Sequence, residues 1–380
     1  MSENHSLVEQ QSLVLVDAIK AEIALHDSIS FAEFMQMALY QPGLGYYSSG
    51  ILKFGKEGDF ITAPLLGDLF AKSLARQIKQ ILQKLDAGVI FELGAGTGQF
   101  CFDVLKELDR LNSLPEKYLI LEVSADLQQR QQHLVQQLPK HLADLVDWQT
   151  RPPAEKFKGV IFANEVIDAL AVEVFRYENG RYLQKRIGWN DGFVTSWHKF
   201  SPNLEQQLLD KNLQLADGYE SEFIPNLASW IQTISENLEQ GVVLFVDYGY
   251  ECSSYYHPQR HEGTLVCYHQ HKANFNYFEN IGVQDMTAFI DFTSLAQGAD
   301  DCGLQVDGYT TQAHFLMSLG INELLGDSEK DFTSYYEKTT ELKKLSLPNE
   351  MGEKFKVMAL TKKFDEPLNG FLFSNQLHLL

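Results

Sequence analysis

The chain has 380 residues, of which 44% are hydrophobic and 22% are charged, as in an ordinary globular protein with a full core. Its formal net charge of −20 argues against a nucleic-acid partner, because phosphates are bound mainly by lysine and arginine. No apolar run is long enough to span a membrane, and the N-terminus lacks a signal-peptide pattern. We therefore predict a cytoplasmic protein without a membrane span.

The first 86 residues predict a helical segment followed by a lid. Helical spacing runs through residues 13–25, and Ser30 with Glu33 forms a capping box that opens a second helix. An aromatic, glycine-rich stretch at 40–47 and a second one at 55–62 precede an amphipathic helix at 65–85.

The most informative motif follows, where the apolar run 88–91 is followed by Gly94, Gly96 and Gly98. Helical spacing restarts at Phe100, so the motif predicts a strand, a glycine turn and a helix. Glycines let the backbone turn tightly and approach a ligand closely. Unpaired N–H groups of the helix start suit a polar ligand, which indicates a nucleotide-type cofactor.

The spacing around this turn differs from that of a dinucleotide site. A third glycine of that fingerprint would stand at position 99, where the chain has Gln99. Glu122 ends the next predicted strand, 118–123, and its carboxylate can accept both hydrogen bonds of a ribose diol. The pattern resembles class I S-adenosylmethionine-dependent methyltransferases.

Strands and helices alternate after position 88, with further strands predicted at 144–148 and 159–163, which indicates a parallel sheet covered by helices. Asn179-Gly180 joins two strand-like runs and predicts a type I′ hairpin. We predict four parts: a helical and lid segment (1–86), the first part of the cofactor-binding core (87–170), an insertion of β-hairpins and helices on the substrate side (171–240), and the remainder of the core with a loop-rich insertion (241–380).

Polar residues also follow the strand at 159–163, namely Asn164, Glu165 and Asp168. In open α/β sheets, function collects at the carboxyl ends of strands. These side chains are therefore candidate catalytic residues, although Asn164 can equally cap a helix whose first turn carries the two acids.

Other titratable or aromatic residues give weaker signals. Four histidines and Cys267 crowd residues 257–271, but their spacing matches no metal motif, so we predict no metal and leave a catalytic histidine open. The four cysteines are scattered and predict reduced thiols. We expect Trp148 either to pack on an adenine ring or to belong to the hydrophobic core.

Several motifs in chain order resemble those of the MidA-like methyltransferase family, whose mitochondrial members assist respiratory complex I assembly by methylating an arginine. The resemblance covers about residues 30–360 and rests on the segments 40–47, 58–62, 92–98, 121–124, 164–170, 247–249, 285–292 and 351–357. It implies a class I Rossmann-like core, a mostly parallel seven-stranded sheet, and S-adenosyl-L-methionine as cofactor.

The resemblance also assigns site residues. It implies a cofactor site that includes the proposed ribose acid and the lid residues, formed by Glu92, Gly94, Ala95, Gly96, Gly98, Glu122, Val123, Asp59, Phe60 and Trp148. Glu165 and Asp168 would face a substrate arginine on a protein. Family members often have proline at the positions of Ala95 or Ala171.

The leading prediction is thus a protein-arginine N-methyltransferase. A small-molecule N- or O-methyltransferase and a non-catalytic assembly factor that binds S-adenosyl-L-methionine remain as alternatives, and a homodimer is left open.

Overall fold

The computed structural model describes residues 2–49, 62–270, 272–327 and 329–380. The chain divides into two compact units, each built from three separate segments of sequence. One unit comprises Ile61–Ile167, Ala228–Gly249 and Phe292–Leu380, and the other Met1–Phe60, Asp168–Leu227 and Tyr250–Asp291. We call them the core unit and the insertion unit.

The core unit is built on a sheet whose seven strands run in the order β15-β16-β10-β5-β2-β3-β4. Its strands are β2 (Val89–Leu93), β3 (Lys117–Leu121), β4 (Val146–Gln149), β5 (Phe157–Asn164), β10 (Leu238–Tyr250), β15 (Gln305–Thr311) and β16 (Phe355–Lys362). The pairings of β10, β5, β2, β3 and β4 are all parallel, whereas β16 pairs antiparallel with both β10 and β15. The predicted mostly parallel seven-stranded core is confirmed.

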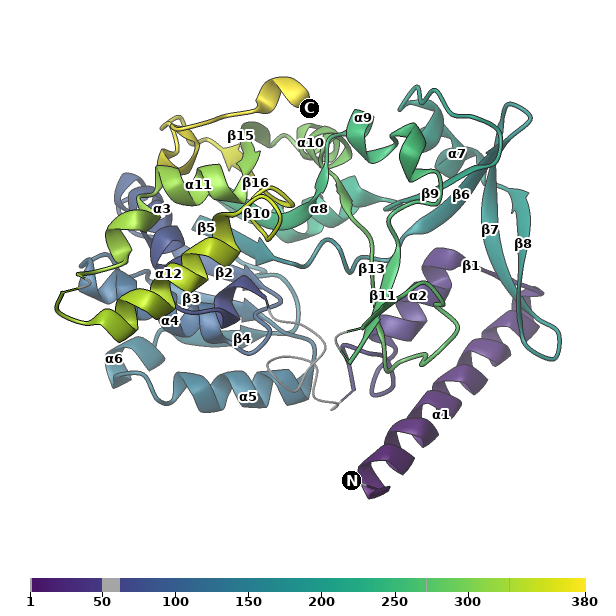
Figure 1. Ribbon diagram of the computed structural model, residues 1–380, viewed down its shortest axis with the longest axis horizontal. Coiled ribbons are helices and arrows are strands. Elements are labelled where there is room, and N and C mark those ends of the chain that lie inside the picture. Colours follow the sequence, from purple (N-terminus) through teal and green to yellow (C-terminus); the bar gives the residue numbers. More distant parts are fainter. Residues whose placement is uncertain (1, 50–61, 271, 328) are drawn as a thin grey trace. The chain divides into compact units, whose positions relative to one another are not determined.

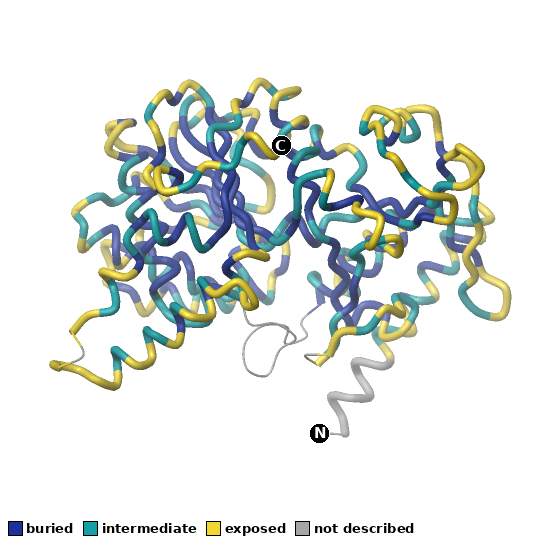
Figure 2. The backbone as a smooth tube through the Cα atoms, turned by 45° about the horizontal axis from the view of Figure 1, so that its top comes forward, coloured by how far each residue is buried: buried dark blue, intermediate teal, exposed yellow. Residues whose placement is uncertain are grey.

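Helices surround this sheet (Figure 1). They are α3 (Leu69–Leu85), α4 (Gln99–Arg110), α5 (Ala125–Val135), α6 (Lys140–Ala143), α8 (Leu227–Ser235), α10 (Phe292–Asp301), α11 (Gln312–Ser318) and α12 (Phe332–Ser346). The central strands are buried because both sheet faces are covered (Figure 2). Phe100 of α4 stacks on Phe162 of β5 with ring centroids 4.2 Å apart, which fixes the helix after the glycine turn against the sheet.

Short 3₁₀ turns complete the core unit, at Ala63–Leu65, Ile321–Leu324, Asn369–Phe371 and Leu377–Leu379. Close packing of α8 on α10 depends on a glycine, because a Cβ at Gly298 would lie 3.1 Å from Ile231 Cδ1.

The insertion unit contains two antiparallel sheets. The larger follows the order β1-β7-β6-β9, with β8 paired to β7, and the smaller follows the order β12-β11-β13. The strands are β1 (Ile29–Ser30), β6 (Glu173–Glu178), β7 (Arg181–Trp189), β8 (Phe193–Lys199), β9 (Tyr219–Phe223), β11 (Val266–His269), β12 (Lys272–Asn274) and β13 (Asp285–Thr287). A further short strand, β14 (Ile290–Asp291), belongs to neither of these sheets. The helices are α1 (Ser2–His26), α2 (Phe31–Tyr40), α7 (Pro202–Leu209), α9 (Cys252–Tyr255) and the 3₁₀ turn Pro258–Arg260.

Local sequence explains two boundaries in this unit. Ser30 Oγ accepts from Glu33 N at 3.1 Å while Ser30 N donates to Glu33 Oε2 at 2.7 Å, so the predicted capping box opens α2. Asn179 and Gly180 have φ of 52° and 75°, which is the positive pair that a type I′ turn requires, and the predicted β6–β7 hairpin is confirmed. Within the described residues no helix is both long and apolar enough to cross a membrane.

Candidate functional site

The loop between β2 and α4 has the conformation that its glycines permit. Gly94, Gly96 and Gly98 have φ of 62°, 53° and 83°, which L side chains rarely adopt. A Cβ at Gly94 would lie 3.0 Å from Val166 Cγ2, whereas the equivalent position at Gly96 has no atom of the described residues within 4 Å. The loop is therefore left-handed at three points, and its backbone at Gly96 is open to a ligand.

Glu122 lies one residue beyond the end of β3 and is 7% exposed. Its Oε1 accepts from Ser124 N at 2.8 Å, and its Oε2 accepts from Gln131 Nε2 at 3.0 Å. A carboxylate is a strong acceptor and can bind the two hydroxyl groups of a ribose diol. The neighbouring Val123 is 64% exposed and offers an apolar surface beside this carboxylate.

Glu92 lies in β2 beneath the glycine loop and is 3% exposed. Burial raises the pKa of its carboxyl from 4.5 to about 8, although the hydrogen bond from Tyr118 Oη at 2.8 Å acts in the opposite direction. At neutral pH Glu92 is therefore mainly protonated and can form a hydrogen bond without placing a second charge near Glu122.

The turn after β5 carries the predicted catalytic residues of the core unit. Glu165 has φ of 53°, a left-handed conformation that is strained for its side chain. Its N–H donates to Val246 O at 3.0 Å, and Asn164 Nδ2 donates to Glu165 Oε1 at 3.0 Å. Both side chains are half-buried at the carboxyl end of the strand. Asn164 does not begin a helix, so the capping interpretation is wrong.

Asp247 supports this turn from the neighbouring strand β10. Its side chain is 1% exposed, and Oδ2 accepts from Ile167 N at 3.0 Å while Oδ1 accepts from Tyr248 N at 2.9 Å. From the sequence, Asp247 was noted only within the segment 247–249 and was assigned no role. Its function in fixing the turn depends on parallel pairing of β5 with β10.

Asp168 belongs to the insertion unit, where it is 5% exposed. Its backbone carbonyl accepts from Ala288 N at 3.0 Å. Burial raises the pKa of Tyr47 well above its usual value, and the nearby Asp285 and Asp168 raise it further. Asp168 therefore lies in an acidic, tyrosine-rich part of that unit, and Tyr47 Oη donates to Asp285 Oδ2 at 2.9 Å.

The remaining predicted residues have different outcomes. Asp59 and Phe60 lie outside the described residues. Trp148 is half-buried in β4, packs against the core and donates from Nε1 to Gln131 Oε1 at 2.9 Å. His271 also lies outside the described residues, and His257 Nδ1 accepts from Gln259 N at 3.2 Å. In the described part of the chain, no three His, Cys, Asp or Glu side chains are grouped to hold a metal.

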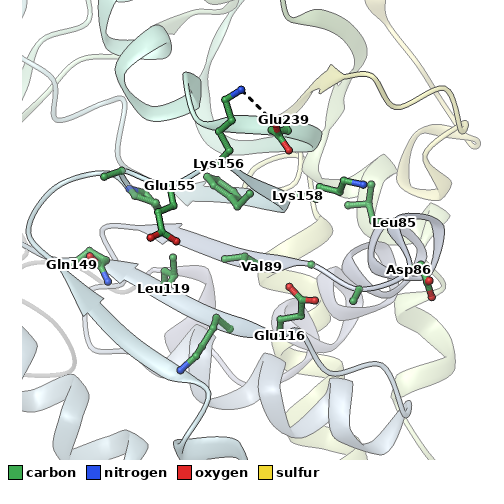
Figure 3. A pocket seen from close by; sticks show the side chains of 16 residues that line it. Leu85, Asp86, Val89, Glu116, Leu119, Gln149, Glu155, Lys156, Lys158 and Glu239 are labelled. Carbon is green, nitrogen blue, oxygen red and sulfur yellow. Dashed lines mark ion pairs between the residues drawn. The ribbon is translucent and has the colours of Figure 1, made fainter.

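A hollow of about 770 Å³ lies near the amino ends of β2, β3 and β5 (Figure 3). Its rim mixes lysines and carboxylates, and Lys156 Nζ lies 3.5 Å from Glu239 Oε1 across it. The glycine loop and Glu122 lie at the opposite, carboxyl end of the same strands, which is where cofactors bind in such sheets. The sheet therefore predicts cofactor binding at its carboxyl edge.

A seven-stranded sheet of this order, with an open glycine loop after one strand and a carboxylate after the next, is the architecture of a class I S-adenosyl-L-methionine-dependent methyltransferase. Residues 73–310 match a family described as "Putative S-adenosyl-L-methionine-dependent methyltransferase". The chain belongs to this family, and the resemblance to MidA-like methyltransferases is confirmed.

Solved structures agree with this assignment. A "likely methyl transferase" from Burkholderia thailandensis bound to S-adenosyl-homocysteine is 33% identical, with a TM-score of 0.93 over 98% of each chain. S-adenosyl-L-methionine is the cofactor of this enzyme. The open backbone at Gly96 and the acceptor capacity of Glu122 fit such a group.

Curated relatives are named protein arginine methyltransferases. The mitochondrial NDUFAF7 homologue of Drosophila melanogaster is 25% identical over 91% of this chain and 84% of its own length. Mitochondrial NDUFAF7 of Danio rerio is 25% identical over 90% and 85%. Our prediction of a cytoplasmic protein is contradicted by these mitochondrial relatives. It rested on composition and on missing targeting patterns, neither of which fixes the compartment of a folded protein.

Proposed function

We propose that this methyltransferase acts on an arginine side chain of a protein, with Glu165 as the substrate-facing acid and Asn164 beside it. The observation that carries the proposal is the left-handed Glu165 at the carboxyl end of β5. Strained backbone of this kind costs on the order of 1–3 kcal/mol and is concentrated at functional sites. Asp247 and Val246 hold the turn in this conformation through hydrogen bonds.

The side chains of the turn suit a guanidinium group. Glu165 offers carboxylate oxygens, and Asn164 Oδ1 is buried without a hydrogen-bond partner among the described residues. A guanidinium carries five N–H donors and stays charged at all ordinary pH values, so it matches an acceptor-rich turn. Names of the curated relatives as protein arginine methyltransferases support the same substrate class.

The chemistry follows from this arrangement. S-adenosyl-L-methionine supplies an electrophilic methyl group on its sulfonium. Glu165 can accept two N–H bonds of the guanidinium, localise its positive charge and orient one nitrogen for attack. As the new N–C bond forms, the S–CH₃ bond would break and S-adenosyl-homocysteine would leave as a neutral thioether. The arginine nitrogen also loses a proton, for which a neighbouring carboxylate is a suitable acceptor. Most of the acceleration should come from placing the two reactants and excluding water.

The test is transfer of label from S-adenosyl-L-methionine into protein. Lysate of the host that lacks this gene would be incubated with wild-type protein, with Glu165→Gln, and with Glu116→Gln as a matched control on an exposed residue. We expect labelled protein that yields methylarginine on hydrolysis with the wild type and the control, and a loss of at least about 100-fold with Glu165→Gln, since removal of one preorganised charged contact costs roughly 10²–10³ in rate.

Other outcomes would redirect the assignment. Label that is found only in small molecules, and that does not change when the lysate is treated with protease, would favour a small-molecule methyltransferase. Tight binding of S-adenosyl-L-methionine with no labelled product in any fraction would favour the non-catalytic assembly factor. Equal labelling by wild type and Glu165→Gln would contradict the role given to Glu165.

A further inference from the structure

We propose that Gln131 is a positioning residue for the cofactor. Its side-chain amide forms hydrogen bonds with the glycine loop, with Glu122 directly after β3 and with Trp148 of β4. Gln131 lies on α5 and is fully buried. This inference rests on cofactor binding by the family and not on the identity of the methyl acceptor.

Three hydrogen bonds use both donors and one acceptor position of the Gln131 amide. Nε2 donates to Gly96 O at 2.9 Å and to Glu122 Oε2 at 3.0 Å. Oε1 accepts from Trp148 Nε1 at 2.9 Å. A tryptophan nitrogen can only donate, and a carbonyl or carboxylate oxygen can only accept, so these partners allow one orientation of the amide.

The consequence is a fixed relation between two parts of the cofactor site. Because one nitrogen atom bonds to both, Gly96 O and Glu122 Oε2 are held close to each other. The side-chain carbons of Gln131 also limit the loop, since a Cβ at Gly98 would lie 3.2 Å from Gln131 Cγ. Glu122 is therefore oriented before any ligand arrives, which lowers the entropic cost of binding.

The chemistry of glutamine is essential in this position. A methionine has a similar shape but leaves Glu122 Oε2 and Gly96 O without this donor. A glutamate has almost the same shape but adds a carboxylate against Glu122, with Glu92 also nearby. Arg130 and Asp126 on the same helix form their own ion pair at 2.8 Å.

The experiment measures S-adenosyl-homocysteine binding by calorimetry for the full chain. We expect Gln131→Met and Gln131→Glu to weaken binding at pH 8 by about tenfold or more, as for loss of a hydrogen bond to a charged group. Gln129→Met on the exposed face of α5 should bind as the wild type does. In the ligand-free protein, the indole ¹H–¹⁵N signal of Trp148 should shift in both Gln131 variants.

A pH series separates positioning from mere packing. For Gln131→Glu, affinity should recover between pH 8 and pH 6, because the introduced carboxyl and Glu122 can then share a proton and restore one hydrogen bond. A wild-type-like affinity of Gln131→Glu at pH 8 would overturn the proposal, as would weakened binding that does not change with pH. If Gln131→Met does not fold, the Gln131→Glu series decides alone. Failure of the wild type to bind would instead count against the methyltransferase assignment.

Discussion

At the scale of single residues, Glu122 is the side chain on which cofactor affinity should depend most. Its oxygens accept hydrogen bonds from Ser124 N and Gln131 Nε2, which orient the carboxylate for the ribose that we predict it binds. Glu122→Gln replaces one oxygen by an NH₂ group, which cannot accept. We expect S-adenosyl-homocysteine affinity to fall by about tenfold to 100-fold, measured by calorimetry.

Glu116→Gln is the control for this prediction, because Glu116 is exposed and lies directly before β3, at the opposite end of the strand from Glu122. Its affinity should equal that of the wild type. If Glu122→Gln also binds normally, the ribose acid lies elsewhere.

Glu92 gives a second prediction at the residue scale. Its pKa of about 8 in the folded chain exceeds the value of 4.5 expected for the unfolded chain. The folded state therefore binds more protons between these values, and the stability contributed by protonated Glu92 is lost as pH rises from 4.5 through 8. The loss should amount to a few kcal/mol across this pH range.

Glu92→Gln should remove this pH dependence, because an amide keeps an acceptor for Tyr118 and cannot ionise. Urea unfolding of both proteins at pH 5.5, 7.0 and 8.5 measures the difference. Burial also raises the pKa of Glu222 and Glu341, so only the wild-type-minus-variant difference reports on Glu92. A difference that stays constant across the series would show that Glu92 is ionised throughout.

At the scale of elements, strongly patterned segments were predictable and short paired ones were not. The local sequence was sufficient to predict the apolar strands β2 and β5 and the Asn179-Gly180 turn. The small sheet of β11, β12 and β13 was predicted as a loop-rich stretch. Its strands have only four, three and three residues, and their stability comes from pairing and burial that propensity does not encode.

Strand packing gives a prediction that the sequence alone does not make. Gly159 of β5 has φ of 151°, and a Cβ there would lie 1.8 Å from Val89 O of the adjacent strand β2. Gly159→Ala must therefore displace backbone in the centre of the sheet. We expect a loss of about 2–4 kcal/mol in the free energy of unfolding, measured by urea titration.

Gly192→Ala is the matched control. Gly192 follows Asp191 in a surface turn, and a Cβ there meets no atom within 4 Å. Its stability should change by less than about 0.5 kcal/mol. Equal effects of the two substitutions would mean that the contact between β5 and β2 relaxes without cost.

At the scale of the whole molecule, the division into two units explains which parts of the site sequence reasoning could find. The glycine loop and Glu122 are each encoded by a contiguous motif, so they could be predicted. Gln131 could not, because α5 also carries Gln128, Gln129 and Gln132, and only the buried position of one of them separates it from the others. Asp168 was grouped with Glu165 by sequence, yet the chain passes into the insertion unit between them.

This division predicts how cofactor binding spreads through the chain. The described residues that we predict or propose to act in cofactor binding, Gly94–Gly98 with Glu122 and Gln131, all belong to the core unit. At a ligand concentration of 100 times the Kd, binding adds about 2.7 kcal/mol to the stability of the state that binds. Hydrogen exchange with and without S-adenosyl-homocysteine should therefore show protection concentrated in peptides covering 91–102 and 117–132. The β7–β8 hairpin of the insertion unit should exchange at nearly the same rate in both conditions, because local opening of a unit is slowed only by ligands that bind it.

Glu122→Gln at the same ligand concentration should show less protection in the core unit. Uniform protection of both units would contradict this prediction. It would mean that the two units open as a single cooperative structure, which the ligand stabilises as a whole.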